Sequence, residues 1–103
     1  MIDLEEINYI NNLLDIYGSL LSKKQKDYLV MSYRDNLSIS EISEIEKVSR
    51  AAVLDAIIKG KENLKEYEDK MHLLKFIEEE SLKNDEKINE VIERLKEAIF
   101  DGI

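Results

Sequence analysis

Apolar residues recur at helical spacing along almost the whole of this chain, and this pattern most constrains its fold. Near the start, Ile7, Ile10, Leu14 and Tyr17 fall on one side of a helix. No stretch shows the strict alternation of apolar and polar residues that marks a strand. The chain also has no proline and three glycines, a composition that suits helices and poorly suits turn-rich β folds. We therefore expect an all-α protein.

Serine residues mark the starts of the central helices. Ser22-Lys-Lys-Gln25 and Ser38-Ile-Ser-Glu41 each have the form of a capping box. The first predicts a helix from Ser22 to about Arg34, after an initial helix at Leu4–Tyr17. The second predicts a short helix with Ile42 and Ile45 facing inward.

The segment after this short helix resembles the turn of a helix-turn-helix. Glu46-Lys47-Val48 forms the predicted turn, and Ser49 is placed to cap a helix whose inner side carries Val53 and Ile57. We expect Gly60 to end or loosen that helix. Beyond it, an apolar stripe from Leu64 continues to about Glu79.

A last amphipathic helix is predicted near the C-terminus, after the pattern breaks at Ser81–Glu86. Its apolar stripe is wide and needs to be covered, either by folding back onto the core or by pairing with a second copy. Both alternatives stay open, and the second predicts a homodimer. The stripe consists of Ile88, Val91, Ile92, Leu95 and Ile99.

The length of 103 residues fits a single domain, 1–103, with a helix-turn-helix core at about 20–62 and a C-terminal helical extension at about 63–103. The chain has no cysteine, and His72 is its one histidine. This excludes a Cys/His zinc site, and no nucleophile with a matching base is evident. We expect no cofactor, no metal and no enzymatic activity. No apolar run is long enough for a membrane helix, and the acidic start lacks the basic residues of a signal peptide, so we expect a cytoplasmic protein.

The formal net charge of −8 argues against general, charge-driven binding of nucleic acid. The charge is uneven, however. Residues 21–65, which include the helix-turn-helix, hold nine basic and seven acidic residues, whereas both flanking segments are acidic. The candidate nucleic-acid contacts in this region are Lys47, Ser49, Arg50, Lys59 and Lys61.

The segment Leu20–Leu64 resembles region 4 of bacterial sigma factors, with its "LS-x-x-EI" motif, "VSR" and an apolar-spaced recognition helix. A longer likeness, over Ile7–Phe76, is to the YlxM family of small bacterial helix-turn-helix proteins. That resemblance implies a link with the signal recognition particle pathway. The residues that carry it are Tyr17-Gly18, Leu20-Leu21, Lys24-Gln25, Asp55, Tyr67-Glu68 and His72-Leu73-Leu74.

In a helix-turn-helix, the second helix enters the major groove of DNA. At 100° per residue, the outward face of this helix carries Ala51, Leu54, Asp55, Ile58 and Glu62. It lacks the Arg, Lys, Asn and Gln side chains that make bidentate contacts to purines. The family more often has polar, aromatic or basic residues at Ala51, Leu54 and Ile58, and these three are candidate partner contacts instead. Candidate contacts on the last helix are Ile88, Ile92, Leu95 and Ile99.

Three functions are therefore open. One is a regulatory, DNA-binding transcription factor of the sigma region 4 type that binds duplex DNA. The alternative is a protein or ribonucleoprotein interaction module that binds the protein or RNA of the signal recognition particle without reading DNA sequence. The third is a homodimer whose partner is itself.

Overall fold

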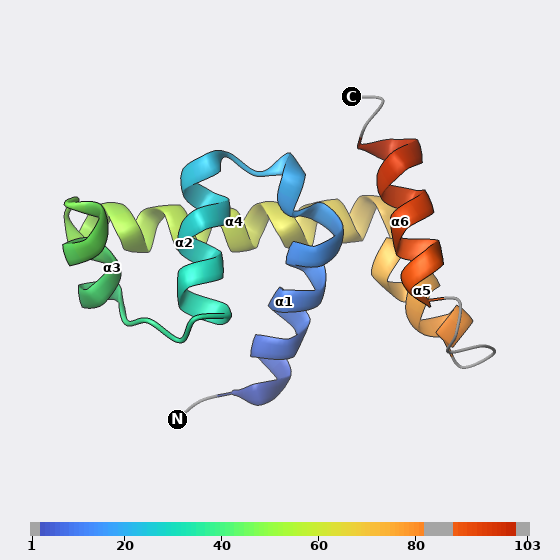
Figure 1. The fold of residues 1–103 in the computed structure, drawn as a ribbon, viewed down its shortest axis with the longest axis horizontal. Coiled ribbons are helices and arrows are strands. Elements are labelled where there is room, and N and C mark those ends of the chain that lie inside the picture. Colours follow the sequence, from blue (N-terminus) through green and yellow to red (C-terminus); the bar gives the residue numbers. More distant parts are fainter. Residues whose placement is uncertain (1–2, 82–87, 101–103) are drawn as a thin grey trace.

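The computed structural model describes residues 3–81 and 88–100, and in this part of the chain helices joined by short turns are the regular structure, with no strand. α4 runs the length of the view in Figure 1, with α3 at one end, α5 and α6 at the other, and α1 and α2 across it. The elements are α1 (Leu4–Tyr17), η1 (Gly18–Leu20), α2 (Lys23–Tyr33), α3 (Ile39–Glu46), α4 (Arg50–Met71), α5 (Leu73–Ser81) and α6 (Ile88–Ile99). The all-α prediction is confirmed.

Side-chain caps fix the starts of the first four α-helices. Asp3 accepts hydrogen bonds from the backbone N–H groups of Glu5 and Glu6 at the start of α1. Both predicted capping boxes form, because Ser22 and Ser38 each bond to the third residue of their helix and receive its side chain in return. These bonds satisfy backbone donors that have no partner inside the helix.

The core lies where α1, α2 and α4 pack against one another. The side chains of Tyr17, Leu29 and Leu64, one from each helix, are fully buried. α3 adds Ile42 to this core and α5 adds Leu74, so every helix up to α5 contributes at least one buried apolar side chain. Burial of this kind supplies most of the free energy that holds amphipathic helices together.

Gly60 neither ends nor loosens α4, contrary to the expectation from sequence, because it lies buried inside an unbroken 22-residue helix. A Cβ atom at this position would lie 2.7 Å from Leu29 Cδ1 and 3.3 Å from Gln25 Cβ. The missing side chain therefore lets α2 approach the backbone of α4 closely. The tertiary packing offsets the roughly 1 kcal/mol by which glycine disfavours a helix interior.

The prediction that Ile45 faces inward is wrong, because its side chain is 58% exposed. α3 is only eight residues long, and its buried side is formed by Ile42 with the partly buried Ile39 and Ser43. Around the helix axis, Ile39 and Ser43 both lie on the same side of Ile42. This side of α3 therefore faces the core. Ile45 lies on the other side of Ile42 and projects into solvent.

The helix expected to continue past Leu64 to about Glu79 is interrupted at His72, which separates α4 from α5. His72 has a left-handed backbone, with φ 54° and ψ 30°. Such a conformation ends an α-helix, and it is usually taken by glycine or asparagine. The sequence pattern missed this break because a histidine gives no warning of it.

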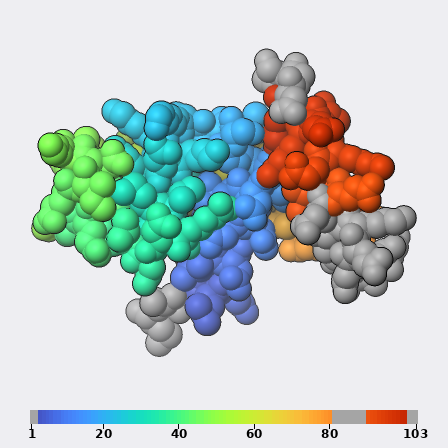
Figure 2. Space-filling model, in the orientation of Figure 1, coloured from blue at the N-terminus to red at the C-terminus, as the bar shows by residue number. Residues whose placement is uncertain are grey.

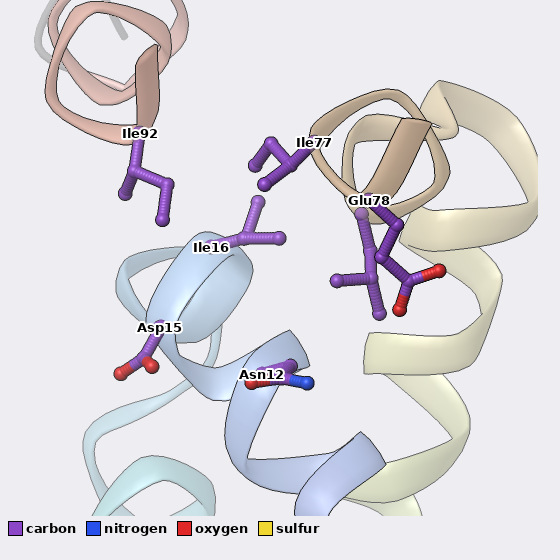
Figure 3. Close-up of a pocket in the computed structure, with 7 residues that line it drawn as sticks. Asn12, Asp15, Ile16, Ile77, Glu78 and Ile92 are labelled. Atoms are coloured by element: carbon purple, nitrogen blue, oxygen red, sulfur yellow. The ribbon is translucent and has the colours of Figure 1, made fainter. Parts of the chain in front are cut away.

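α5 and α6 form a pair that folds back toward α1. Val91, Ile92, Leu95 and Ile99 of α6 are partly buried and pack against the core, so the structure shows the fold-back arrangement of the last apolar stripe. Ile16, Ile77 and Ile92 point toward one another from three helices (Figure 3). Residues 82–86 of the predicted break and the side chain of Ile88 lie outside the described residues, and the homodimer stays a prediction.

Candidate nucleic-acid interface

α3 and α4 form the helix-turn-helix, joined at Lys47 in the left-handed conformation, with φ 56° and ψ 45°. The Ser43 hydroxyl donates a hydrogen bond of 2.6 Å to the Val48 carbonyl, which fastens the turn to α3. Val48 is partly buried and packs against the core between the two helices. The hydrogen bonds that shape this turn join residues close together in the chain.

The start of α4 is the most cationic part of this unit. The Ser49 side chain accepts a hydrogen bond of 3.0 Å from the Ala52 N–H, which confirms it as the cap. Lys47 and Arg50 lie beside it, both exposed. Neither forms an ion pair with any residue that the structure describes. The positive end of the helix dipole and these two side chains together favour an anion.

The two other lysines proposed as nucleic-acid contacts lie elsewhere and are already paired. Lys59 forms an exposed ion pair of 3.1 Å with Asp55, one turn earlier on α4. Lys61 points toward α1 and α2, forms an ion pair of 2.7 Å with Glu6, and lies over the Tyr33 ring. Burial alone would lower the pKa of Lys61, but hydrogen bonding to Glu6 and Tyr33 outweighs it and raises the pKa. Lys61 therefore joins helices together.

The five proposed contacts thus do not form one basic surface. Lys47, Ser49 and Arg50 come together at one end of α4, whereas Lys59 lies two turns along and Lys61 lies toward the molecule's interior. A protein that neutralises several DNA phosphates needs its cations on one surface.

The outward face of α4 is apolar at its centre. Leu54 is 47% exposed and Ile58 46%, and Ala51 is exposed one turn before Leu54. Val53 and Ile57, on the opposite side, are buried. Asp55 and Glu62 add negative charge to the outward face, where DNA-binding proteins carry groups that contact bases and phosphates. This face is better suited to a protein surface than to a nucleic acid.

α3 adds an apolar side chain that sequence reasoning assigned to the core. Ile45 is the most exposed large apolar residue of the helix-turn-helix unit, ahead of Leu54 and Ile58. Two features of the sequence could have indicated that Ile45 is exposed. α3 is only eight residues long, so it buries only a narrow strip, and polar residues surround it. Ile45, Leu54 and Ile58 therefore face solvent on α3 and the first half of α4, and Met71 is exposed at the far end of α4.

A hollow of about 190 Å³ lies between α1, α5 and α6 (Figure 3). Its walls are mostly the apolar side chains of Ile16, Leu74, Ile77 and Ile92, with Asn12, Asp15 and Glu78 at the rim. Among the described residues, no group of three or more His, Asp or Glu side chains is placed to hold a metal ion. Within residues 3–81 and 88–100, no helix is both long and apolar enough to cross a membrane.

The clearest electrostatic feature of the interior is Tyr17. Burial raises its pKa far above the ordinary value of 10.0, and the hydrogen bond of 2.7 Å that its hydroxyl donates to Glu68 Oε1 raises it further. Tyr9, which is partly exposed, has its pKa raised first by burial and then by Glu68, Asp69 and Glu78. Both tyrosines therefore stay protonated and neutral, so Tyr17 acts as a hydrogen-bond donor inside the fold.

Comparison with known proteins gives a consistent result. Residues 4–102 match the family model described as "UPF0122: Putative helix-turn-helix protein, YlxM / p13 like". The UPF0122 protein of Bacillus thuringiensis (strain Al Hakam) is 42% identical over 105 residues, which cover 93% of this chain and 96% of the relative. The UPF0122 protein of Bacillus mycoides (strain KBAB4) is 40% identical with the same coverage. That of Pediococcus pentosaceus is 43% identical over 84 residues, covering 82% of this chain and 74% of the relative.

Proposed function

Because this chain belongs to the UPF0122 family of YlxM/p13-like helix-turn-helix proteins, we propose that it is a regulatory interaction module of the signal recognition particle pathway. In this proposal, it binds a protein partner through the outward face of α4 and does not read DNA sequence. The link with the particle comes from the family resemblance. The choice of a protein partner comes from the face itself.

One observation carries this choice: Leu54 and Ile58 stand exposed where a DNA-reading helix carries polar and basic groups. Exposed apolar side chains grouped on one face, with charged residues around them, are typical of protein interfaces. Glu62 lies on the same face, and the whole chain has a net charge of −8, although Asp55 on this face is paired with Lys59. A basic partner, such as the RNA-binding domain of the targeting GTPase, therefore complements it in charge.

The test is the affinity of the purified chain for that basic domain, measured by isothermal titration calorimetry. Replacing Leu54→Asp and Ile58→Asp together should weaken binding at least tenfold, because two apolar contacts are lost and two carboxylates must be stripped of water at the centre of the interface. The matched control is Leu4→Asp with Phe76→Asp, which alters two apolar residues on other helices that are at least as exposed as Leu54 and Ile58. Circular dichroism checks that both double variants stay folded.

The proposal fails if the unaltered chain shows no affinity for the domain, or if the control pair weakens binding as much as the α4 pair. The association rate should also fall as salt is added, since opposite charges steer the encounter. A rate that is independent of salt would remove the electrostatic part of the argument.

Binding of duplex DNA is the second candidate, and the unpaired Lys47 and Arg50 beside the start of α4 favour it. It predicts a salt-sensitive gel shift with promoter DNA that Arg50→Ala abolishes. Lys65→Ala, which alters an exposed lysine about four turns further along α4, is the control. Absence of a shift at low salt would eliminate this candidate.

A further inference from the structure

A second hollow, of about 280 Å³, collects three basic side chains from two helices that are far apart in the sequence. Lys26 comes from the first turns of α2, Arg34 from the residue that ends α2, and Lys96 from α6. We call this hollow the basic groove. Its lining residues are Leu14, Asp15, Ser19, Lys26, Arg34, Lys96 and Phe100.

The positive charge of the basic groove is not neutralised from within. Asp15 is the one acidic lining residue among those that the structure describes, and it is paired with Arg34, whose guanidinium also donates a hydrogen bond of 3.3 Å to the Asn11 carbonyl. Lys26 and Lys96 have no ion-pair partner in the part of the chain that the structure describes. Three cations and one carboxylate give the described lining residues a formal charge of +2, in a chain of net charge −8.

Most of the other lysines on α2 and α4 form ion pairs with acidic side chains. Lys23 bonds to Asp27, and Lys70 bonds to Glu66, each at the i, i+4 spacing. The unpaired Lys26 and Lys96 are different because they share one hollow, although 70 positions separate them in the sequence. Two ammonium groups that line the same concave site repel each other, and an anion between them removes that repulsion.

The groove also has a defined shape. A Cβ atom placed on Gly18 would lie 3.7 Å from Lys26 Cε, so the stem of Lys26 lies against the backbone of η1. Buried Leu14 forms part of the wall, and the ring of Phe100 packs edge-on against Tyr17 with 6.4 Å between ring centroids. In Figure 2 the blue surface of the N-terminal part of the chain and the red surface of α6 meet. The ammonium groups therefore stand on a fixed, partly apolar wall.

We propose that the basic groove binds a terminal phosphate, that is, a phosphomonoester. Near pH 7 a phosphomonoester carries a charge of about −1.5 to −2, close to the +2 of the groove, whereas a phosphodiester within a nucleic-acid strand carries −1. Arginine and lysine are the side chains that bind phosphate most effectively, through forked and point-charge contacts respectively. The apolar part of the wall leaves room for an attached organic group.

Two sources share this chemistry: a free nucleoside monophosphate and the 5′-phosphate end of an RNA. The experiment measures the affinity of the full chain for adenosine monophosphate, for a 5′-phosphorylated RNA oligomer and for the same oligomer with a 5′-hydroxyl. We expect the first or the second to bind, and the hydroxyl form to bind at least tenfold more weakly than the phosphorylated one. Which of the two binds more tightly identifies the source.

Variants of the groove test its residues. Lys26→Gln and Lys96→Gln should each raise the Kd at least tenfold, while Lys24→Gln, an exposed lysine on the same helix outside the groove, should change it less than twofold. Because all three positions are partly or fully exposed, circular dichroism should show unchanged folding. Leu54→Asp with Ile58→Asp should leave phosphate binding unaltered, which separates this proposal from the one for α4.

A pH series gives an independent readout. The second proton of a phosphomonoester dissociates near pH 6, so the affinity should rise between pH 5 and pH 7 as the ligand becomes a dianion. The proposal is overturned if neither phosphomonoester binds at millimolar concentration. It is also overturned if the phosphorylated RNA binds and the 5′-hydroxyl oligomer binds equally well, or if Lys24→Gln weakens binding as much as Lys26→Gln.

Discussion

At each end of α4 the chain breaks sharply from one helix to the next, and the hydrogen bonds that hold the two breaks differ. We call these two breaks the joints. At each end a non-glycine residue takes a left-handed backbone, Lys47 with φ 56° and His72 with φ 54°. At the first, Ser43 holds the turn and Ser49 caps the following helix, so all the bonds join residues within five positions of each other. At the second, the bonds reach back across the fold to Tyr17.

The joint between α4 and α5, at His72, depends on the carboxylate of Glu68. Glu68 accepts hydrogen bonds from the N–H groups of Leu74 and Lys75, at 3.0 and 3.2 Å, in place of a serine cap on α5. Its Oε1 also accepts from the Tyr17 hydroxyl, which in turn accepts from the Leu73 N–H at 3.2 Å. A cap that is local and one that depends on tertiary structure should respond differently to substitution, and four predictions test this difference.

Glu68→Ala should have the largest effect. It removes three hydrogen bonds at once and leaves donors near the core without partners, which we expect to lower the free energy of unfolding by about 2–4 kcal/mol. Urea denaturation measures it. Glu66→Ala, two residues earlier, is the control, because Glu66 is exposed and pairs only with Lys70. Equal effects of the two substitutions would show that the joint does not depend on Glu68.

Tyr17→Phe should cost about 1–2 kcal/mol, because it keeps the ring and loses the bonds to Glu68 and Leu73. It also predicts a pH dependence. Since burial and Glu68 raise the pKa of Tyr17 above its ordinary value of 10.0, the folded state resists its ionisation. This stabilisation is fully present below about pH 10 and is lost as the pH rises further.

Denaturation series from pH 8.5 to pH 11 therefore distinguish the two proteins. The unaltered chain should lose stability above pH 10 more steeply than Tyr17→Phe, while Tyr9 and the other tyrosines contribute equally to both. Parallel curves would mean that Tyr17 ionises as freely in the folded chain as in the unfolded one.

Tyr17 and Glu68 also show which contacts cannot be predicted from the sequence. The caps at Ser22, Ser38 and Ser49 could be predicted because the bonding groups lie three residues apart, as written in the sequence. The Tyr17–Glu68 bond joins residues 51 positions apart, and nothing local indicates it. His72 gives no sign of its left-handed backbone, since the signal for a helix end is usually glycine or asparagine.

Packing explains the remaining differences. Gly60 has the local appearance of a helix end, and only the closeness of Leu29 shows why a glycine is needed inside α4. The outward direction of Leu54 and Ile58 could be predicted from helical spacing, because α4 is long enough to define its faces. The basic groove could not be predicted, because its two lysines belong to different helices and the sequence does not indicate how those helices are arranged.

Ser49→Ala should lower the free energy of unfolding by about 1 kcal/mol, the usual cost of losing a helix cap. The effect should be smaller than that of Glu68→Ala, because only one local bond is lost. Ser40→Ala is the control, as its hydroxyl caps no helix. A loss at Ser49 as large as that at Glu68 would remove the distinction between a local and a tertiary cap.

Replacing the left-handed residue at each joint by glycine should give the smallest change in the free energy of unfolding, and this change should be stabilising. Lys47→Gly and His72→Gly each relieve a left-handed backbone, which we expect to add about 0.5–1 kcal/mol. Asn36, with φ 56°, is the control, because asparagine tolerates this conformation better and Asn36→Gly should gain less. Thermal unfolding measures all three. A gain at Lys47 with a loss at His72 would show that the histidine side chain itself supports the joint.

The unbroken length of α4 has a geometric consequence. At 1.5 Å per residue its 22 residues extend about 33 Å, most of the molecule's longest dimension of 44 Å. The helix thus acts as a rigid spacer that holds α5 and α6 away from the outward face near Ala51 and Leu54. Leu54 lies 17 residues before Met71, so a partner bound at Leu54 is held about 25 Å along the helix axis from the start of α5.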